Sequence, residues 1–268
     1  MVSFRGASAE AMAHLTDRVG GVAEGSAATV AENLFAAAGS FRSEGSLRRF
    51  AIDQSVAVEA RTGVVRDVFA GKIDPAALDL VAAAAGQRWT KPRDLADALE
   101  QLGVVAAVRS VGLQAATLVD ELFGVRRLVD GNTDLRNALS DPARSAADKS
   151  GLVESLLSGK VLAATVLLVR QALAGSHRTV TAALEDYERT AAQVNGEGVA
   201  TVHSARPLDE ATQQRLTSAL TRQYGRPVHL NIVVDPAVVG GLRVEIGDDV
   251  IDGTVSARLD DARRKIAG

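Results

Sequence analysis

An internal repeat constrains the fold of this chain more than any other feature of its sequence. Residues 34–84 align without a gap to residues 122–172, a shift of 88 positions. The identical pairs include Phe35 and Phe123, Gly71 and Gly159, Lys72 and Lys160, and Leu80 and Leu168. A repeat of this length indicates one structural unit copied in tandem. We therefore expect the same fold twice before the C-terminal part.

The apolar spacing within each copy predicts α-helices. Apolar side chains recur at i, i+1, i+4 and i+5 in residues 152–157, and the same spacing returns in residues 64–69. Gly71 and Gly159 follow these segments and are expected to end the helices, because glycine readily closes a helix. Aromatic residues make up only 3% of the chain. We therefore expect short helices packed closely by small aliphatic side chains.

Two helical bundles are expected, over residues 1–103 and 94–194, with the segment 94–103 common to both. That segment, "DLADALEQLG", is similar to residues 182–190, which close the second copy, and to residues 10–20, which open the first. We therefore predict that a single helix ends the first bundle and begins the second.

The C-terminal part, residues 195–268, changes to an apolar period of two, which is typical of strands. Strands are predicted at 199–205 and 227–235, with a helix over 207–224 between them and a hairpin turn at Gly247. The predicted fold class is mostly α: duplicated N-terminal helical bundles are followed by a small C-terminal α+β domain.

The apolar residues of this domain define the faces expected to form its core. One face of the second strand should carry Val228, Leu230, Ile232 and Val234. The helix before it should contribute Leu216, Leu220 and Tyr224 at i, i+4 and i+8. A final helix should face the sheet with Val255, Leu259, Ala262 and Ile266.

Composition excludes several classes of function. The chain has 30 basic and 33 acidic residues, a net charge of -3, which argues against a nucleic-acid binder held by a basic face. Cysteine is absent, so disulfides and cysteine metal sites are excluded, and a reducing cytoplasm fits. The longest apolar run, Val161 to Val169, is far shorter than the about 20 residues of a membrane span. No membrane-spanning segment is expected.

Two Gly-Lys pairs superficially suggest phosphate binding. A phosphate-binding loop needs a glycine five residues earlier, where Arg66 and Glu154 stand, and a serine or threonine after the lysine. Neither pair meets these conditions. Lys72 and Lys160 are instead expected at helix ends, exposed to solvent.

The aspartates Asp248, Asp249 and Asp252 are expected to shape the backbone rather than bind a metal. Neighbouring strand residues point to opposite faces, and no histidine or further carboxylate joins them at ligand spacing. Asp248 or Asp249 suits an Asx-type turn, and Asp252 or Thr254 suits the cap of the final helix. The four histidines are too dispersed for a zinc motif. We predict no catalytic residue, no metal and no cofactor.

The tail resembles a known family. The stretch "GGLRVEIGDDVIDGTVSARL" (240–259) looks like the C-terminal signature of the delta subunit of bacterial F-type ATP synthases, known in mitochondria as the oligomycin-sensitivity-conferring protein. The matching positions are Gly240, Gly241, Gly247, Asp248, Ile251, Asp252, Gly253, Thr254, Val255, Arg258 and Leu259. A weaker resemblance runs back to about Trp89. Residues 1–88 have no place in the usual short subunit and look like the extra copy of actinobacterial members.

The resemblance implies a non-catalytic peripheral-stalk subunit, a stator at the cytoplasmic face of the cell membrane that couples proton-driven rotation to ATP synthesis. The helical region is expected to bind the N-terminal helices of alpha subunits, and the C-terminal module the membrane-anchored b subunits. In this family the first and fifth helices of a bundle form a groove for the alpha helix. In the second copy the groove is expected at Leu95, Leu99, Leu102, Leu167, Leu168 and Gln171. In the first copy it is expected at Met12, Leu15, Leu78 and Val81.

Two alternatives stay open at this point. One is a helical adaptor or scaffold unrelated to the synthase, whose duplicated bundle serves other partners. The other is an enzyme whose α+β module holds a small ligand, which the lack of a convergent set of polar groups disfavours. The sequence leaves open which copy accepts the alpha-subunit helix and what the extra bundle does.

Overall fold

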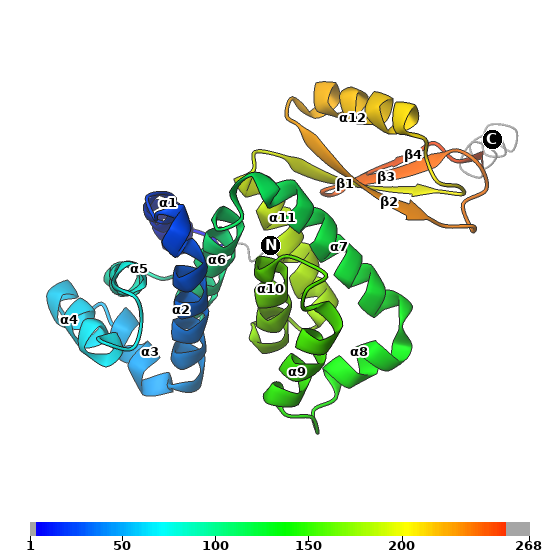
Figure 1. Ribbon diagram of the computed structural model, residues 1–268. Helices are drawn as coiled ribbons and strands as arrows, with labels where there is room; N and C mark the ends of the chain where they lie inside the picture. Colours follow the sequence, from blue (N-terminus) through cyan, green and yellow to red (C-terminus); the bar gives the residue numbers. More distant parts are fainter. Residues whose placement is uncertain (1–3, 256–268) are drawn as a thin grey trace, which may run out of the picture. The chain divides into compact units, whose positions relative to one another are not determined.

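The computed structural model describes residues 4–255 and divides the chain into two compact units, Met1–Ala191 and Ala192–Gly268. Over the residues that the structure describes, the first unit is helical, and the second packs an α-helix against a four-stranded sheet (Figure 1). The predicted fold class, mostly α with a small C-terminal α+β domain, is confirmed.

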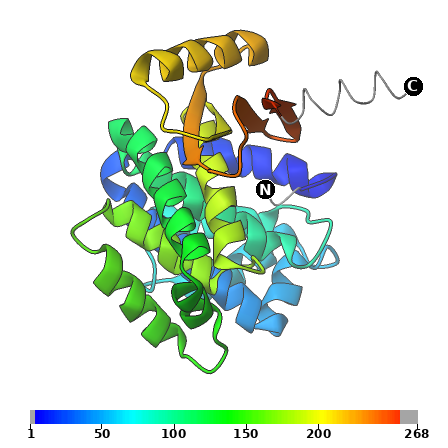
Figure 2. The same cartoon turned by 90° about the vertical axis from the view of Figure 1, so that its right-hand side faces the viewer.

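The helical unit consists mainly of α-helices of 8 to 20 residues joined by short connections (Figures 1 and 2). In chain order they are α1 (Ala7–Gly20), α2 (Glu24–Ser43), α3 (Gly45–Ile52), α4 (Val58–Phe69), α5 (Pro75–Gly86), α6 (Asp94–Arg109), the 3-10 helix η1 (Gly112–Gln114), α7 (Ala115–Gly131), α8 (Thr133–Ser140), α9 (Ala146–Leu157), α10 (Ala163–Ala174) and α11 (Val180–Val194). The bounds of α3, α4 and α5 lie 88 positions before those of α8, α9 and α10, so the helices repeat as the sequence does.

The two Gly-Lys pairs lie at equivalent helix ends. Gly71, at φ 68°, follows α4, and Gly159, at φ 73°, follows α9. The Nζ of Lys72 donates to the carbonyl of Val68 at 2.8 Å, and the Nζ of Lys160 donates to the carbonyl of Leu156 at 2.8 Å. Each lysine therefore satisfies a carbonyl that the helix end leaves free. The prediction of solvent-exposed lysines at helix ends is confirmed.

The helix α6 lies at the centre of the helical unit. It packs against α1, α2 and α5, which precede it in the chain, and against α7 and α10, which follow it. Most of its side chains are buried, including the carboxylates of Asp94 and Glu100. A helix that is buried on most of its surface has neighbours on several sides, unlike the single apolar stripe of a surface helix.

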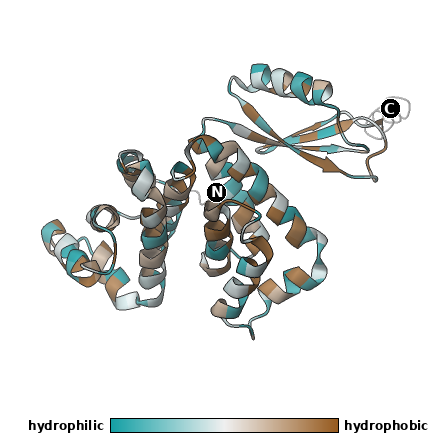
Figure 3. Cartoon of the chain, in the orientation of Figure 1, coloured by the Kyte–Doolittle hydropathy of each residue, from teal (hydrophilic) through white to brown (hydrophobic). Residues whose placement is uncertain are grey.

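The C-terminal unit contains a sheet of strand order β2-β1-β3-β4. Its elements are β1 (Gly198–Ser204), α12 (Glu210–Tyr224), β2 (Val228–Val234), β3 (Leu242–Ile246) and β4 (Asp249–Asp252). β1 pairs with β2 in parallel and with β3 antiparallel. Burial alternates residue by residue along β1, as in a sheet with one buried face. Figure 3 shows apolar and polar residues interspersed along the strands. The side chains of Leu216, Leu220 and Tyr224 pack on this face, as predicted.

Two details of the C-terminal unit differ from the sequence-based expectation. The helix begins at Glu210 rather than at Pro207, because the Asp209 carboxylate caps it by accepting from the backbone N–H of Thr212 at 2.7 Å. The apolar face of β2 holds only at its start. Val228 and Leu230 join the core, whereas Val234 is 39% exposed at the strand end.

The final helix expected to carry Leu259, Ala262 and Ile266 lies outside residues 4–255, apart from its first residue, Val255. Within the described residues, no single helix is both long enough and apolar enough to cross a bilayer. Over the same residues, α6 together with residues 112–131 is the one pair that reaches that length and composition, and it bends by 107° at its break.

Candidate partner-binding faces

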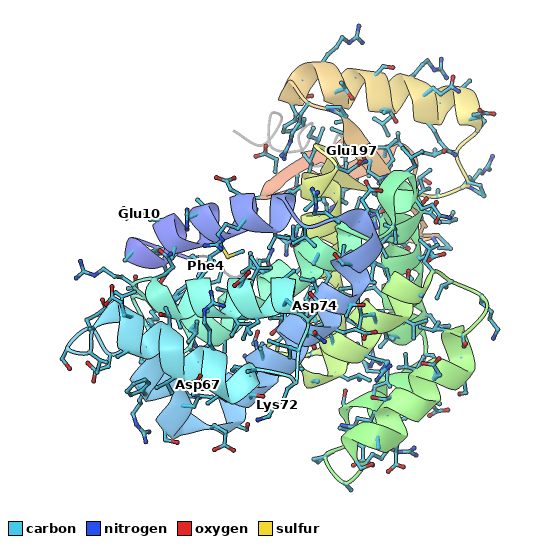
Figure 4. All side chains as sticks on the ribbon, turned by 60° about the vertical axis from the view of Figure 1, so that its left-hand side comes forward. Phe4, Glu10, Asp67, Lys72, Asp74 and Glu197 are labelled. Atoms are coloured by element: carbon cyan, nitrogen blue, oxygen red, sulfur yellow. The ribbon has the colours of Figure 1, made fainter. Side chains whose placement is uncertain are left out.

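The α1/α5 face is formed where the first and fifth helices of the N-terminal repeat lie side by side (Figure 4). Of the four residues predicted to line a groove there, Leu15 and Val81 are completely buried. Met12 and Leu78 are half-buried and keep access to solvent. The face therefore offers two apolar side chains above an apolar base.

The α6/α10 face is the equivalent pair of helices in the second repeat. The structure buries Leu95, Leu99, Leu102 and Leu168 completely and leaves Gln171 8% exposed. Of the six residues predicted to line this groove, Leu167 alone is half-buried. The helix α2 contacts both α6 and α10. This face is therefore covered within the chain itself.

The contact between α2 and α6 is close because Gly103 has no side chain. A Cβ atom at Gly103 would lie 2.5 Å from the ring of Phe35. Real Cβ contacts do not approach so closely, so the ring occupies the space that any larger residue would need.

A buried polar cluster joins α2 and α6 to the second repeat. At the end of α2, Arg42 forms ion pairs with Glu100 and, at 3.3 Å, with Asp97. The other oxygen of Glu100 accepts from the Tyr187 hydroxyl at 2.5 Å. The backbone N–H of Ser176 also donates to Glu100, at 3.2 Å. The carboxylate of Glu100 thus holds α2, α6, α11 and the turn after α10 together.

Burial shapes the acid-base properties of this cluster. Burial raises the pKa of Asp97, and the nearby Arg42 opposes that rise. Burial, followed by the charge of Glu100, raises the pKa of Tyr187 well above its usual value. Tyr187 therefore stays protonated at neutral pH and donates its hydrogen bond to Glu100.

A similar ion pair joins the equivalent helices of the second repeat, although Arg126 lies 84 positions after Arg42 while Glu188 lies 88 after Glu100. Glu188 on α11 pairs with Arg126 on α7 at 3.5 Å, as Glu100 on α6 pairs with Arg42 on α2. α6 therefore makes toward α2 the contact that α11 makes toward α7.

A pocket of about 350 Å³ opens between α2, α9 and α10. It is lined by Glu32, Phe35, Ser150, Leu167, Arg170, Gln171 and Ala174. Among residues 4–255, no group of three or more His, Cys, Asp or Glu side chains is placed to hold a metal ion.

The signature residues of the tail meet in space. Gly240 and Gly241 have φ of 65° and 79°, a region that disfavours other residues. A Cβ atom at Gly241 would lie 2.3 Å from the carbonyl oxygen of Gly253. The N–H of Gly253 donates to Leu242 at 2.9 Å, and that of Val255 donates to Gly240 at 3.2 Å. The glycine pair therefore lets the chain after β4 return against the start of β3.

Two aspartates of the tail have structural partners. Asp252 accepts from the Thr254 hydroxyl at 2.6 Å and from its N–H at 2.9 Å, and these bonds, the hydroxyl first, hold the pKa of Asp252 below its usual range. Asp249 starts β4 and accepts from the Tyr224 hydroxyl at 3.2 Å. The turn itself contains Gly247, at φ 59°, and Asp248. Ile251 is half-exposed, whereas Arg258 and Leu259 lie outside the described residues.

Comparison with known proteins decides the family. Residues 96–266 match the family described as "ATP synthase delta (OSCP) subunit". The chain belongs to this family. Its members are non-catalytic peripheral-stalk subunits of the F-type ATP synthase. The family match therefore sets aside both the unrelated adaptor and the small-ligand enzyme.

Curated relatives match along the whole chain. The ATP synthase subunit delta of Nocardioides sp. is 54% identical over 99% of this chain and 98% of its own length. That of Kineococcus radiotolerans is 46% identical over 92% and 91%, and that of Streptomyces coelicolor 37% over the full length of both. Among solved structures, a chain of the Toxoplasma gondii mitochondrial ATP synthase hexamer aligns with a TM-score of 0.36 and 20% identity, covering 62% of this chain and 96% of that chain. The alignments with the Nocardioides and Streptomyces coelicolor proteins extend over the duplicated helical region of this chain.

The polar cluster around Glu100 was not among the residues predicted from sequence. Its partners are far apart in the chain, since Arg42 and Tyr187 lie 58 and 87 positions from Glu100. The repeat offered one signal. Glu188 stands 88 positions after Glu100, at a position that the alignment of the two copies did not reach.

Proposed function

We propose that this chain joins the catalytic hexamer of the ATP synthase to its membrane-anchored b subunits. The helical unit binds the N-terminal helix of an alpha subunit, and the C-terminal unit holds the distal ends of the b subunits. The observation that carries this proposal is a family match that spans both of two separate compact units. A chain with two units suits a task that needs two partners at once.

The proposed mechanism is mechanical. Rotation of the central shaft drags the hexamer with it unless a stator anchored to the membrane sector holds the hexamer still. Each docked contact raises the effective concentration at the next one, so several weak contacts resist dissociation better than any single contact. On this proposal the chain works at the cytoplasmic face of the cell membrane as a peripheral part of the complex.

The helical unit is proposed to consist of two bundles, residues 1–103 and 94–194, that share α6, followed by the C-terminal domain at 195–268. Two sets of contacts support this division. On the first side, the Ser8 hydroxyl donates to Asp94 at 2.7 Å, and Arg42 pairs with Glu100. On the second side, Gln101 donates to the Thr190 hydroxyl at 2.9 Å.

Reconstitution tests the function. Membranes stripped of this chain are given back the purified protein, and ATP-driven proton pumping and proton-driven ATP synthesis are measured. We expect the wild type to restore both and to co-purify with alpha and b subunits. The double variant Met12→Asp with Leu78→Asp should restore less, because both side chains reach solvent on the α1/α5 face.

A matched control is available on α7. Leu128 is 47% exposed there, and Leu128→Asp should restore coupling like the wild type. If the wild-type chain failed to restore coupling, or recovered neither alpha nor b subunits, the proposed function would be wrong.

A further inference from the structure

The internal repeat provides two equivalent pairs of helices, α1/α5 and α6/α10. The two pairs differ in whether another helix packs on the face that they form. The α6/α10 face is covered by α2, which contacts both of its helices. The α1/α5 face leaves Met12 and Leu78 half-exposed. Two copies of one fold therefore differ in whether a further helix is already seated on them.

The seat of α2 is specific at both the apolar and the charged contact. The Phe35 ring lies against the backbone of α6 at Gly103, where a Cβ atom would be 2.5 Å away. One helical turn from Gly103 toward its N-terminus, Glu100 pairs with Arg42 of α2. Glu100 also binds Tyr187 and the N–H of Ser176, both in the second repeat. A single buried carboxylate therefore ties α2 to the bundle that it covers.

A small pocket remains beside α2 on the α6/α10 face. It is the pocket of about 350 Å³ that Glu32 and Phe35 of α2 line together with Leu167 and Gln171 of α10. Leu167 and Gln171, two of the residues predicted to line a groove on this face, therefore lie beside α2.

We propose that α2 is a built-in occupant of the α6/α10 face, so that each chain accepts one guest helix, on the α1/α5 face. The identity of the guest, an alpha-subunit N-terminal helix, rests on the proposed function. The extra N-terminal bundle thus covers the α6/α10 face with α2 and provides the α1/α5 face as a binding site. Glu100 acts as a positioning residue that keeps α2 in place.

Two measurements on the full-length chain test this inference. The first is calorimetric titration with a synthetic peptide of the alpha-subunit N-terminal helix from the same organism. The second uses the absence of native cysteine: spin labels at Glu32→Cys and Arg170→Cys report the distance between α2 and α10 by pulsed electron paramagnetic resonance. Both residues line the pocket, on α2 and α10, and both are exposed.

We expect one peptide per chain, and a single narrow distance distribution that saturating peptide leaves unchanged. Met12→Asp with Leu78→Asp should weaken peptide binding more than tenfold. Leu167→Asp, on the covered face, should change it less than twofold, like the surface control Leu128→Asp. Circular dichroism confirms that each variant is folded.

Binding of two peptides would overturn the inference, as would a broad or peptide-widened distance between the labels, or loss of binding through Leu167→Asp alone. One further outcome would count against the proposed function but not against this inference. If no peptide bound while the labels gave one narrow distance, the alpha-subunit helix would be the wrong guest and α2 would still close its seat.

Discussion

At the scale of single residues, Gly103 makes the sharpest prediction about packing. Gly103→Ala would place a Cβ atom 2.5 Å from the Phe35 ring, and overpacking of this kind costs about 1–3 kcal/mol. We expect the free energy of unfolding, measured by urea denaturation, to fall by that amount. Phe35→Leu in the same chain should recover part of the loss.

The control for this prediction is Gly124→Ala. Gly124 is exposed within α7, and a Cβ atom there meets nothing within 4 Å. Alanine is favoured over glycine in a helix interior by about 0.5–1 kcal/mol. Gly124→Ala should therefore stabilise the chain, and equal destabilisation by both substitutions would show that the Phe35 contact is not the cause.

A second prediction at this scale concerns Asp252. Its pKa lies below the usual range because Thr254 donates two hydrogen bonds to it. The folded-state pKa is depressed, so the stabilising contribution is present above the unfolded pKa and is lost as the pH falls through the folded one. Thr254→Val should raise the pKa of Asp252 toward its ordinary value. NMR titration of the carboxyl carbon measures this, and an unchanged midpoint would contradict it.

Short-range roles at this scale were predictable, and long-range partners were not. The glycine and lysine at the ends of α4 and α9 act within one helical turn, so the local sequence was sufficient to identify them. The partners of Glu100 come from two distant helices. Nothing in the sequence around Glu100 distinguishes a buried ion pair from a solvated carboxylate on an exposed helix face.

At the scale of elements, Glu100 should matter more than an exposed carboxylate of the same type. Glu100→Gln keeps the side-chain shape but removes the charge that Arg42 pairs with, and a hydrogen bond to a charged group contributes about 1.5–3 kcal/mol. We expect a loss within that range in urea denaturation. Arg42 keeps Asp97 as a partner, which limits the loss.

The matched control lies on α11. Glu185 pairs with Arg189 at 3.5 Å at the surface, with half of its side chain exposed, and such pairs contribute about 0–1 kcal/mol. Glu185→Gln should therefore be nearly neutral. If Glu100→Gln were also neutral, Glu100 would not hold α2 in place.

The start of α12 shows why helix existence is easier to predict than helix ends. The apolar spacing of Leu216, Leu220 and Tyr224 correctly placed the helix on the sheet. The spacing does not determine the first turn, where Asp209 caps the helix two residues beyond the proline that had suggested its start. β2 is one residue shorter at each end than the predicted 227–235, and its apolar face ends where the core cluster stops, before Val234.

At the scale of the whole molecule, limited proteolysis should separate the two units rather than the two repeats. Residues 193–196 are exposed and lie next to the boundary between the units, whereas α6 is buried along most of its length. Exposed connecting segments are the preferred sites of cleavage. A protease of broad specificity should cut first near 193–196 and leave an intact helical fragment, identified by mass spectrometry.

Early cleavage near Gly103 that released two stable halves would contradict a helix common to both bundles.

The sequence indicated the repeat, the fold class and the family, because each depends on residue patterns that can be read directly along the chain. It did not show that α2 covers the α6/α10 face. The position of one copy against the other depends on side-chain fit at Phe35 and Gly103, which no periodic pattern encodes.

The continuity of α6 has a consequence for how the chain bears load. When two bundles are joined by a flexible linker, the linker bends before either bundle deforms. Here an unbroken, hydrogen-bonded rod from Asp94 to Arg109 runs between the helices on either side of it. Moving one proposed bundle against the other would disrupt packed side chains around α6 rather than bend a flexible linker. We therefore expect the helical unit to be stiff. An insertion of one residue in α6 would rotate the helices that follow it by about 100° relative to those before it. The packing of both bundles therefore constrains the length of α6.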